Sequence, residues 1–434
     1  MRLGGRIAAA IEVLADIEGR HRPASEALRD WGISHRFAGA KDRNVIGNLV
    51  YDALRHRASA RFVADADTPR AAMLGTLFLY WRLRASDIND AFGVDPHAPE
   101  RVTAEEERAL AERTLADAPA HVRADVPEWL EERLRASFGV EDWVAECAEL
   151  AARPPLDLRA NALKTAQVKV LAVLDKFAAT GARYAPEAVR IPATEGEGRH
   201  PNVEVEPAFQ KGWFEVQDAG SQIAARLVGA KAGEQVLDLC AGGGGKSLAL
   251  AAIMGNKGQI FATDNDRSRL APIFDRLKRA GTRNVQVRPV GESLGDLLGK
   301  MDRVVIDAPC TGSGTWRRHP DAKWRLSQNS LEDRKRQQAA ILESAAAYVR
   351  PGGTLTYVTC SLFEDENEEQ VAAYLKQRGG WRLQSAEENL ANSGLPPTTV
   401  VALARFGQPG SGILLSPRRT STDGFFVATM ERGA

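Results

Sequence analysis

Residues 235–247 read QVLDLCAGGGGKS, an apolar run that passes directly into four glycines, a lysine and a serine. The apolar run predicts a β-strand over 235–240, and the glycines mark a tight turn ahead of a helix. A strand, a glycine turn and a helix open the βαβ unit of doubly wound sheets, whose ligands bind at the carboxyl ends of the strands. The stretch therefore predicts a fold class and the edge of the sheet where a site would lie.

The same alternation of strand and helix continues toward the carboxyl terminus. Apolar runs predict strands at 259–264, 285–290, 303–307 and 354–359, with helices between them, notably at 331–349. Such alternation indicates an α/β, Rossmann-like domain with a doubly wound, mostly parallel sheet.

The amino-terminal part has a different character. Apolar residues recur at helical spacing over 7–14 and 46–54, which predicts helices. The basic run RHRASAR at 55–61 is interpreted as a solvated helix end. Prolines and charges crowd residues 95–125 and indicate a linker or boundary.

A short strand at 156–161 and a helix near 165–179 indicate a small α+β module between the helices and the sheet. The predicted domains are therefore 1–125, which is all-α; 126–205, a small α+β subdomain; and 206–434, the doubly wound domain.

Composition is that of a globular, cytoplasmic protein. A chain of 434 residues is too long for one ordinary core, and 44% hydrophobic with 26% charged residues is typical of globular domains. The longest apolar run, 71–81, is too short to span a bilayer, and the amino terminus lacks a signal-peptide pattern, so no membrane partner is expected. Four cysteines without paired spacing indicate a reducing compartment, and no Cys/His cluster has the spacing of a metal site. The oligomeric state is left open, and a monomer is compatible with the pattern.

Net charge does not indicate nucleic-acid binding, because basic and acidic residues number 57 each. A local basic patch can still bind phosphate. Residues 316–325, WRRHPDAKWR, place four basic residues beside two tryptophans. The segment is interpreted, with equal weight, as a contact for phosphates and bases or as a loop with packed tryptophans.

The glycine loop admits three interpretations. A P-loop requires glycine at position 240, where this chain has Cys240, so that signature fails. A nicotinamide dinucleotide fingerprint fits the four glycines only loosely. For S-adenosylmethionine, the methionine carboxylate would meet backbone N–H groups of the loop, and Asp264 at the end of the next strand would accept bonds from the ribose hydroxyls. NAD remains a competitor, because Asp264 suits both cofactors.

Two thiols follow strands at the same edge of the sheet, Cys310 in IDAPC and Cys360 in YVTCS. A thiolate that adds to carbon 6 of cytosine makes carbon 5 nucleophilic, so that it can accept a methyl group. The chemistry requires positive charge near the thiol, which Lys246 can supply, and a group on the base edge, which Asp307 can supply. From the residues alone, which thiol attacks is open. Cys147, by contrast, is interpreted as a small buried hydrophobe.

Several stretches together resemble the Sun-type family of RNA cytosine-5 methyltransferases, which includes the RsmB and nucleolar relatives. They are FEVQDAGSQIAARLV at 214–228, VLDLCAGGGGKS at 236–247, IDAPCTGSGTWRRHPDAKW at 306–324, YVTCSLFEDENEEQV at 357–371 and DGFFVATMER at 423–432. Residues 156–164, LDLRANALK, are similar to the family's small RNA-binding subdomain, and residues 38–57 to its NusB-like helical domain.

The resemblance implies a class I methyltransferase domain that uses S-adenosylmethionine and an RNA substrate. It assigns the nucleophile to Cys360 and product release to Cys310. The family loop usually reads CAAPGGKT, and the acid near the adenine is usually an aspartate, where this chain offers Glu292. The residues implied to contact the cofactor are Cys240, Ala241, Gly242, Gly243, Gly244, Gly245, Lys246, Asp264, Glu292 and Asp307.

The function expected is cytosine-5 methylation of RNA. The NusB-like domain favours small-subunit ribosomal RNA, and transfer RNA is the alternative substrate. A non-catalytic RNA-binding protein of ribosome assembly is a further alternative, although it leaves Lys246, Asp307, Cys310 and Cys360 without a shared purpose. A dehydrogenase is least favoured, because it gives the paired thiols no role.

Overall fold

A computed structural model describes residues 1–407 and 410–434, and these form two compact units. The first unit contains residues 1–154, 193–200 and 315–326, and the second contains 155–192, 201–314 and 327–434. The division into three domains that the sequence predicts, 1–125, 126–205 and 206–434, remains a proposal.

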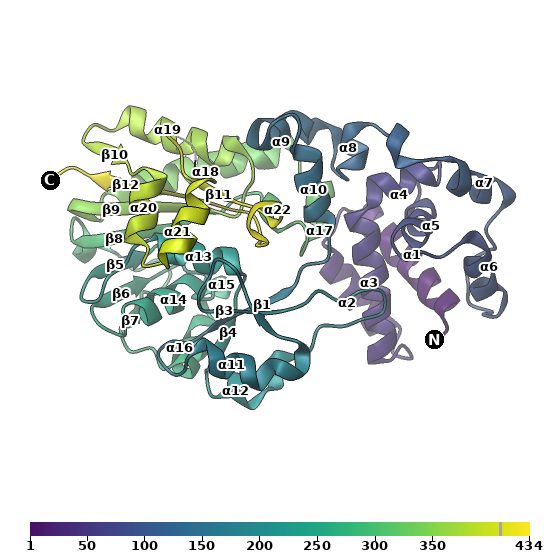
Figure 1. Ribbon diagram of the computed structural model, residues 1–434, viewed down its shortest axis with the longest axis horizontal. Helices are drawn as coiled ribbons and strands as arrows, with labels where there is room; N and C mark the ends of the chain where they lie inside the picture. The colour runs from purple at the N-terminus through teal and green to yellow at the C-terminus, as the bar shows by residue number, and fades with distance from the viewer. Residues whose placement is uncertain (408–409) are drawn as a thin grey trace. The chain divides into compact units, whose positions relative to one another are not determined.

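The first unit is helical (Figure 1). Short helices also occupy much of residues 95–125, where a linker is expected from the sequence. Its helices are α1 (Leu3–Arg20), α2 (Ala24–Ser34), α3 (Ala40–Arg55), α4 (Arg57–Val63), α5 (Pro69–Leu79), α6 (Ala85–Gly93), α7 (Ala104–Glu112), η1 (Leu115–Asp117), α8 (Ala120–Arg123), η2 (Glu128–Leu130), α9 (Glu131–Phe138), α10 (Trp143–Ala151) and α17 (Pro320–Arg325).

The helical stripes of the sequence form the core of this unit. Ile7 and Leu14 of α1 and Ile46 and Leu49 of α3 are at most 1% exposed and belong to one apolar cluster. Because residues three or four apart share a helix face, each stripe turns inward as its spacing predicts.

Residues 315–326 are fastened to the end of α3. The Lys323 ammonium donates to the carbonyl of Arg55 at 2.7 Å, and the Trp324 indole N–H donates to the carbonyl of Leu54 at 2.6 Å. Carbonyls in the last turn of a helix lack helical partners, so these side chains satisfy them. Trp316 and Lys323 are 1% and 3% exposed, so the interpretation of this segment as an RNA contact is wrong for these two side chains. The solvated interpretation of the run 55–61 is also wrong for Arg55, which is 7% exposed.

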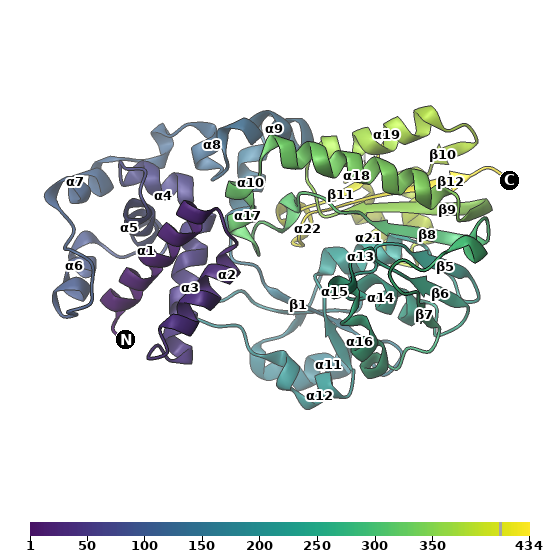
Figure 2. The same ribbon diagram turned by 180° about the vertical axis from the view of Figure 1, so that it is seen from behind.

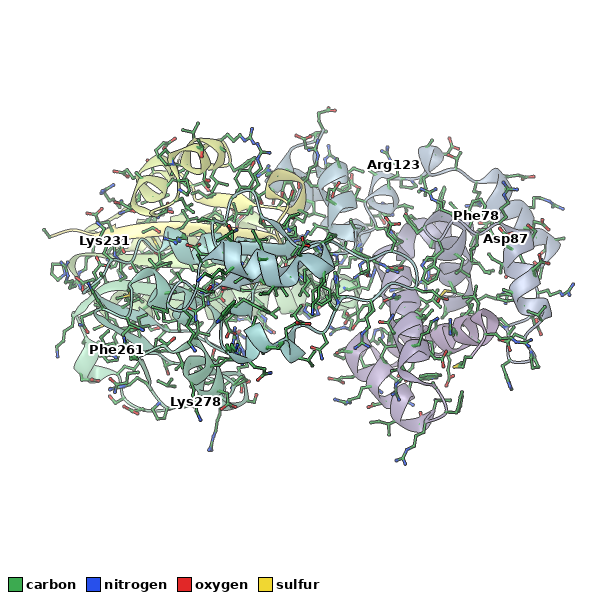
Figure 3. The ribbon with its side chains drawn as sticks, turned by 60° about the horizontal axis from the view of Figure 1, so that its bottom comes forward. Phe78, Asp87, Arg123, Lys231, Phe261 and Lys278 are labelled. Carbon is green, nitrogen blue, oxygen red and sulfur yellow. The ribbon has the colours of Figure 1, made fainter. Side chains whose placement is uncertain are left out.

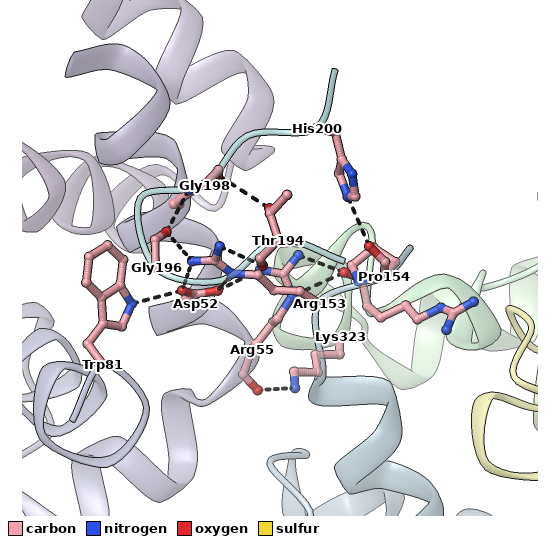
Figure 4. Close-up of polar contacts among 12 residues, drawn as sticks. Asp52, Arg55, Trp81, Arg153, Pro154, Thr194, Gly196, Gly198, His200 and Lys323 are labelled. Carbon is pink, nitrogen blue, oxygen red and sulfur yellow. Dashed lines mark hydrogen bonds and ion pairs between the residues drawn. The ribbon is translucent and has the colours of Figure 1, made fainter. Parts of the chain in front are cut away.

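Asp52 of α3 organises the polar interior of this unit (Figure 4). Its carboxylate accepts from Arg55 at 3.0 Å, from Arg153 at 2.9 Å and from the indole of Trp81 at 2.9 Å. Arg153 also donates to the carbonyls of Thr194 and Gly196, so Asp52 indirectly holds the 193–200 segment.

Replacement of Asp52 by alanine is expected to destabilise the chain by about 3 kcal/mol, because it leaves buried guanidinium groups without their counter-charge. The check is a denaturant or thermal unfolding curve. Asp16→Ala is the matched control, because Asp16 pairs with the exposed Arg20, and exposed pairs contribute less than about 1 kcal/mol. Equal losses in the two variants would contradict the role given to Asp52.

The second unit contains a small antiparallel sheet in the order β2-β3-β1-β4. Leu158, Val189 and Phe214 are fully buried between this sheet and the nearby helices. Its elements are β1 (Leu156–Ala160), α11 (Gln167–Leu174), η3 (Asp175–Phe177), β2 (Thr180–Gly181), β3 (Ala188–Ile191), η4 (Val203–Val205), α12 (Pro207–Gln210) and β4 (Phe214–Val216).

The large sheet of this unit has the order β10-β12-β9-β8-β5-β6-β7, and β11 pairs with β12. The four pairings from β9 to β7 are parallel, and β12 runs antiparallel to its neighbours. The strands are β5 (Gln235–Asp238), β6 (Gln259–Ala262), β7 (Val285–Val287), β8 (Met301–Asp307), β9 (Val349–Thr359), β10 (Trp381–Leu383), β11 (Ile413–Leu415) and β12 (Phe425–Arg432).

Helices cover both faces of this sheet, which confirms the doubly wound α/β fold. In Figure 2, α18 and α19 lie on one side of the strands, and α13, α14 and α16 lie on the other. The helices are α13 (Ala219–Leu227), α14 (Gly245–Ile253), α15 (Arg267–Leu270), α16 (Ile273–Ala280), η5 (Gly295–Leu297), η6 (Ser313–Thr315), α18 (Gln328–Ala346), η7 (Glu364–Glu366), α19 (Glu368–Gln377), α20 (Ala386–Asn392), α21 (Pro397–Ala404) and α22 (Pro417–Thr420). The helix expected at 331–349 ends at Ala346, because Val349 already belongs to β9.

α16 shows how a surface helix supports the site. Its Lys278 side chain projects into solvent (Figure 3), while Ile273 is fully buried. A Cβ on Gly244 would lie 2.5 Å from Ile273, so only glycine fits where the glycine loop crosses this helix.

Among residues 1–407 and 410–434, no helix combines the length and apolarity needed to cross a membrane.

Candidate active site

Four neighbouring strands bring the candidate residues to one edge. β9, β8, β5 and β6 are adjacent and parallel, so their carboxyl ends point the same way. Loops that follow these ends carry Cys360, Cys310, the glycine loop and Asp264 respectively. The alternation read from the sequence therefore predicts this grouping.

The glycine loop has a backbone that other residues rarely adopt. Gly242 and Gly244 have φ values of 48° and 80°, in the left-handed region that favours glycine. Ala241 N–H donates to the carbonyl of Thr263 at 2.9 Å, and Arg276 donates to the carbonyl of Gly243 at 2.6 Å. The loop is thus fixed to its surroundings, and the first turn of α14 presents N–H groups that have no helical partner.

Asp264 joins the second strand to the glycine loop. Its carboxylate accepts from the N–H of Gly242 and from the N–H of Asp266, both at 2.9 Å. Each oxygen has a second lone pair, so the carboxylate retains acceptor capacity toward a ligand hydroxyl.

Asp238 is fully buried at the end of β5, where it accepts a hydrogen bond from Ser247 at 2.6 Å. Burial raises the pKa of Asp238 from 3.8 to about 6, and the Ser247 bond offsets only part of the effect. Because the folded pKa lies above the unfolded value, folding favours the protonated acid. Its contribution to stability is present below pH of about 4 and is lost as the pH rises through about 6.

Asp238→Asn is therefore expected to gain stability relative to the parent as the pH rises from about 4.5 to 7.5, by at most about 3 kcal/mol. The measurement is the difference in unfolding midpoint between variant and parent across that range. Asp333→Asn on the exposed face of α18 should show no such trend, and a flat difference for Asp238→Asn would refute the linkage.

Lys246 is paired with Asp307. Its ammonium is 2.7 Å from the Asp307 carboxylate and 5.3 Å from the centre of the Phe425 ring. Lys246 is 5% exposed, whereas the Asp307 side chain is 37% exposed. The pair places an accessible carboxylate beside a buried cation.

The two thiols are in contact, with 3.4 Å between the sulfurs of Cys310 and Cys360. The hydrogen bond with Cys360 raises the pKa of Cys310 well above its ordinary value, and burial and the charges of Cys360 and Glu366 add to the effect. The raised pKa favours the protonated form of the Cys310 thiol. Burial also raises the pKa of Cys240, which suits a structural role for that residue.

Close backbone packing joins the loops that carry the thiols. Gly314 N–H donates to the carbonyl of Cys360 at 2.9 Å, and Gly424 N–H donates to the carbonyl of Gly314 at 2.8 Å. A Cβ on Gly314 would lie 2.3 Å from the Gly424 carbonyl oxygen, so a side chain there would separate the loops.

Glu366 of η7 was not assigned a role from the sequence. It is fully buried and accepts from the loops that follow both thiols. The available signal was an acid three residues after the apolar Phe363 and six residues after Cys360, although Glu364 and Asp365 precede it.

Glu292, expected near the adenine, is paired with another side chain. Its carboxylate lies 2.9 Å from Arg288, which also binds Asp296. Among the described residues, no contact joins Glu292 to the glycine loop, so its cofactor role remains a proposal. No group of three or more His, Cys, Asp or Glu residues in the described parts of the chain is placed to hold a metal ion.

Two family models match the chain. Residues 225–431 match the model described as 16S rRNA methyltransferase RsmB/F, and residues 126–194 match the ferredoxin-like domain of RsmF/B-like methyltransferases.

Curated relatives give the same family. The chain is 33% identical over 330 residues to ribosomal RNA small subunit methyltransferase B of Escherichia coli O127:H6, which covers 75% of this chain and 70% of that protein. It is 32% identical over 308 residues to the protein of the same name from Enterobacter sp. (strain 638), which covers 70% and 66% respectively. The chain thus matches about two thirds of the length of the Enterobacter relative.

A solved structure is also similar. A methyltransferase homolog protein from Pyrococcus horikoshii superposes with a TM-score of 0.58 at 25% sequence identity, covering 74% of this chain and 100% of that chain.

Proposed function

The chain belongs to the RsmB/F family of 16S rRNA methyltransferases, and we propose that it methylates carbon 5 of a cytosine in RNA. The methyl donor is S-adenosylmethionine, and small-subunit ribosomal RNA is the favoured substrate. The observation that carries the proposal is the 3.4 Å contact between the sulfurs of Cys310 and Cys360, at the ends of adjacent parallel strands. In a reaction that passes through a thiol adduct at carbon 6 of the cytosine, one sulfur can form the adduct and the other can assist its breakdown.

The residues of the glycine loop fit this cofactor. Left-handed glycines and the unpaired N–H groups of the first turn of α14 suit a carboxylate, and Asp264 retains lone pairs for ribose hydroxyls. S-adenosylmethionine supplies an electrophilic methyl group when bound. The chain's own residues activate the cytosine that receives this methyl group.

Cys360 is the proposed nucleophile. What supports it is the raised pKa of Cys310, because a protonated Cys310 can donate a hydrogen bond to a Cys360 thiolate. The Cys360 electron pair forms the bond to carbon 6, and the electrons of the carbon 5–carbon 6 double bond become available at carbon 5. Asp307 accepts from the base edge, and Lys246 beside it offsets negative charge that develops on the ring.

Cys310 is the proposed aid to release. After methyl transfer, carbon 5 loses its proton to solvent base, the double bond re-forms, and the electron pair of the carbon 6–sulfur bond returns to Cys360. The thiol of Cys310 then donates to the departing thiolate, which makes it a better leaving group. We further propose that residues 1–125 and 126–205 contact the RNA.

The test is incubation of the purified chain with small-subunit ribosomal RNA and methyl-labelled S-adenosylmethionine, followed by digestion to nucleosides. The proposal expects label in 5-methylcytidine only. Label in another nucleoside would refute the reaction, and label only with transfer RNA would replace the substrate. No transfer to any stable RNA by folded protein that binds S-adenosylmethionine would favour a binding role.

A further inference from the structure

The Glu366 carboxylate lies between the two thiol loops. One oxygen accepts from the N–H of Thr311 and from the side-chain amide of Gln338, both at 2.9 Å. The other accepts from the hydroxyls of Thr311 and Ser361, both at 2.5 Å. Thr311 directly follows Cys310, and Ser361 directly follows Cys360, so one side chain holds the residue after each thiol.

We propose that Glu366 is a positioning residue for the thiol pair: its buried carboxylate clamps the loop after Cys310 to the loop after Cys360 and thereby holds the two sulfurs in contact. The inference rests on the proposed function for its catalytic consequence, while the clamp itself concerns the protein alone. Glu366 acts through the two loops and has no contact with substrate assigned to it.

Hydrogen-bond chemistry explains why a carboxylate is needed at this position. All four groups that face it are donors, and only a carboxylate offers two acceptor oxygens without a hydrogen of its own. Glutamine at position 366 would present one oxygen and one NH₂ group, so it could not accept from all four groups: the hydroxyls of Thr311 and Ser361 would have to turn and accept from the NH₂ group. Because Glu366 is fully buried, a hydrogen bond that is reversed or lost there is costly.

The charge of Glu366 acts in the same direction as its geometry. The titratable groups that face the thiols are Glu366, the buried Tyr357 and each other. Burial raises the pKa of Glu366, and when the carboxylate is charged it helps to keep Cys310 protonated. The clamp therefore also favours the protonated form of the Cys310 thiol.

The first test needs no RNA. Diamide oxidises two adjacent thiols to a disulfide and is itself reduced to the hydrazine, so the rate of disulfide formation between Cys310 and Cys360 reports how well the sulfurs are held together. In the full-length chain, Glu366→Gln is expected to form this disulfide at least about tenfold more slowly than the parent, because glutamine cannot accept from all four groups that hold the two loops together. Glu364→Gln is the matched control, since Glu364 is two residues away and partly exposed. Equal rates for Glu366→Gln and Glu364→Gln would overturn the proposal.

The second test measures methyl transfer by the same variants. Glu366→Gln is expected to lower kcat by about tenfold to 100-fold with little change in the KM for S-adenosylmethionine, and Glu366→Asp should recover part of the loss. A normal kcat in Glu366→Gln would overturn the catalytic consequence. If the parent itself transfers no methyl group, the function fails while the oxidation test still decides the clamp. An unfolding curve of each variant shows whether a slower reaction comes from a loosened thiol pair or from a chain that is globally unfolded. If Glu366→Gln does not fold, Glu366→Asp takes its place in both tests.

Discussion

Cys360→Ala is expected to abolish methyl transfer and to leave cofactor binding intact. In the proposed reaction the Cys360 thiolate forms the bond to carbon 6, and without that bond carbon 5 of cytosine is not nucleophilic enough to accept a methyl group. The rate is expected to fall by at least about 10³-fold, as for the loss of a nucleophile in covalent catalysis. Binding of S-adenosylmethionine should change little, because the glycine loop and Asp264 do not depend on the thiol.

The measurement is a single-turnover assay with labelled S-adenosylmethionine, beside a binding titration of the same preparation. Cys147→Ala is the control, because Cys147 is a buried thiol in the first unit whose pKa is raised to about 12 by burial. A Cys360→Ala variant that turns over at the parental rate would show that another group attacks the base.

Cys310→Ala is expected to trap the protein on its RNA. The sulfur of Cys310 lies 3.4 Å from that of Cys360 and its raised pKa favours the protonated thiol, so its loss removes a hydrogen bond to the departing thiolate. A hydrogen bond to a charged group contributes about 1.5–3 kcal/mol, which corresponds to a roughly 10- to 100-fold slower elimination. Methyl transfer itself should proceed once, because Cys360 is still present.

The readout is a band of RNA-linked protein on a denaturing gel after reaction with S-adenosylmethionine. The double variant Cys310→Ala/Cys360→Ala should give no such band, because the bond is made by Cys360. A Cys310→Ala variant that turns over repeatedly with no adduct would leave Cys310 without a role in release.

The sequence predicts the site where it depends on strand order. Apolar periodicity identifies β8 and β9, and parallel alternation places their carboxyl ends at one edge of the sheet, so it predicts Cys310 and Cys360 at that edge. Only the fold shows that the two strands are adjacent and that the sulfurs are 3.4 Å apart. The run of glycines at 242–245 likewise predicts a tight turn, and Gly242 and Gly244 adopt left-handed backbone conformations that few other residues adopt.

The rest depends on contacts between segments far apart in the chain. Glu366 reads as one acid in an acidic run, and only the fold shows that it is the buried one with four donors around it. Lys323 belongs to a segment that the sequence offers as a contact for phosphates, but it is buried and satisfies the last carbonyl of α3. Periodicity reports which face of an element is apolar, and it carries no information about such long-range polar partners.

Nor does spacing reveal which charges pair. The sequence predicts Lys246 as a positive charge near a thiol, and the fold places its ammonium 2.7 Å from Asp307. The sequence predicts Glu292 as a cofactor contact, and in the fold its carboxylate pairs with Arg288.

The proposed reaction, methylation of carbon 5 of a cytosine in small-subunit ribosomal RNA, is tested most directly in cells. Total RNA is bisulfite-sequenced from cells that lack this protein, from their parent and from cells complemented with the Cys360→Ala variant. One or more cytosines in small-subunit ribosomal RNA are expected to be protected in the parent and converted in both other samples. Unchanged protection at every covered cytosine of the stable RNAs, or protection restored by Cys360→Ala, would contradict the proposed reaction.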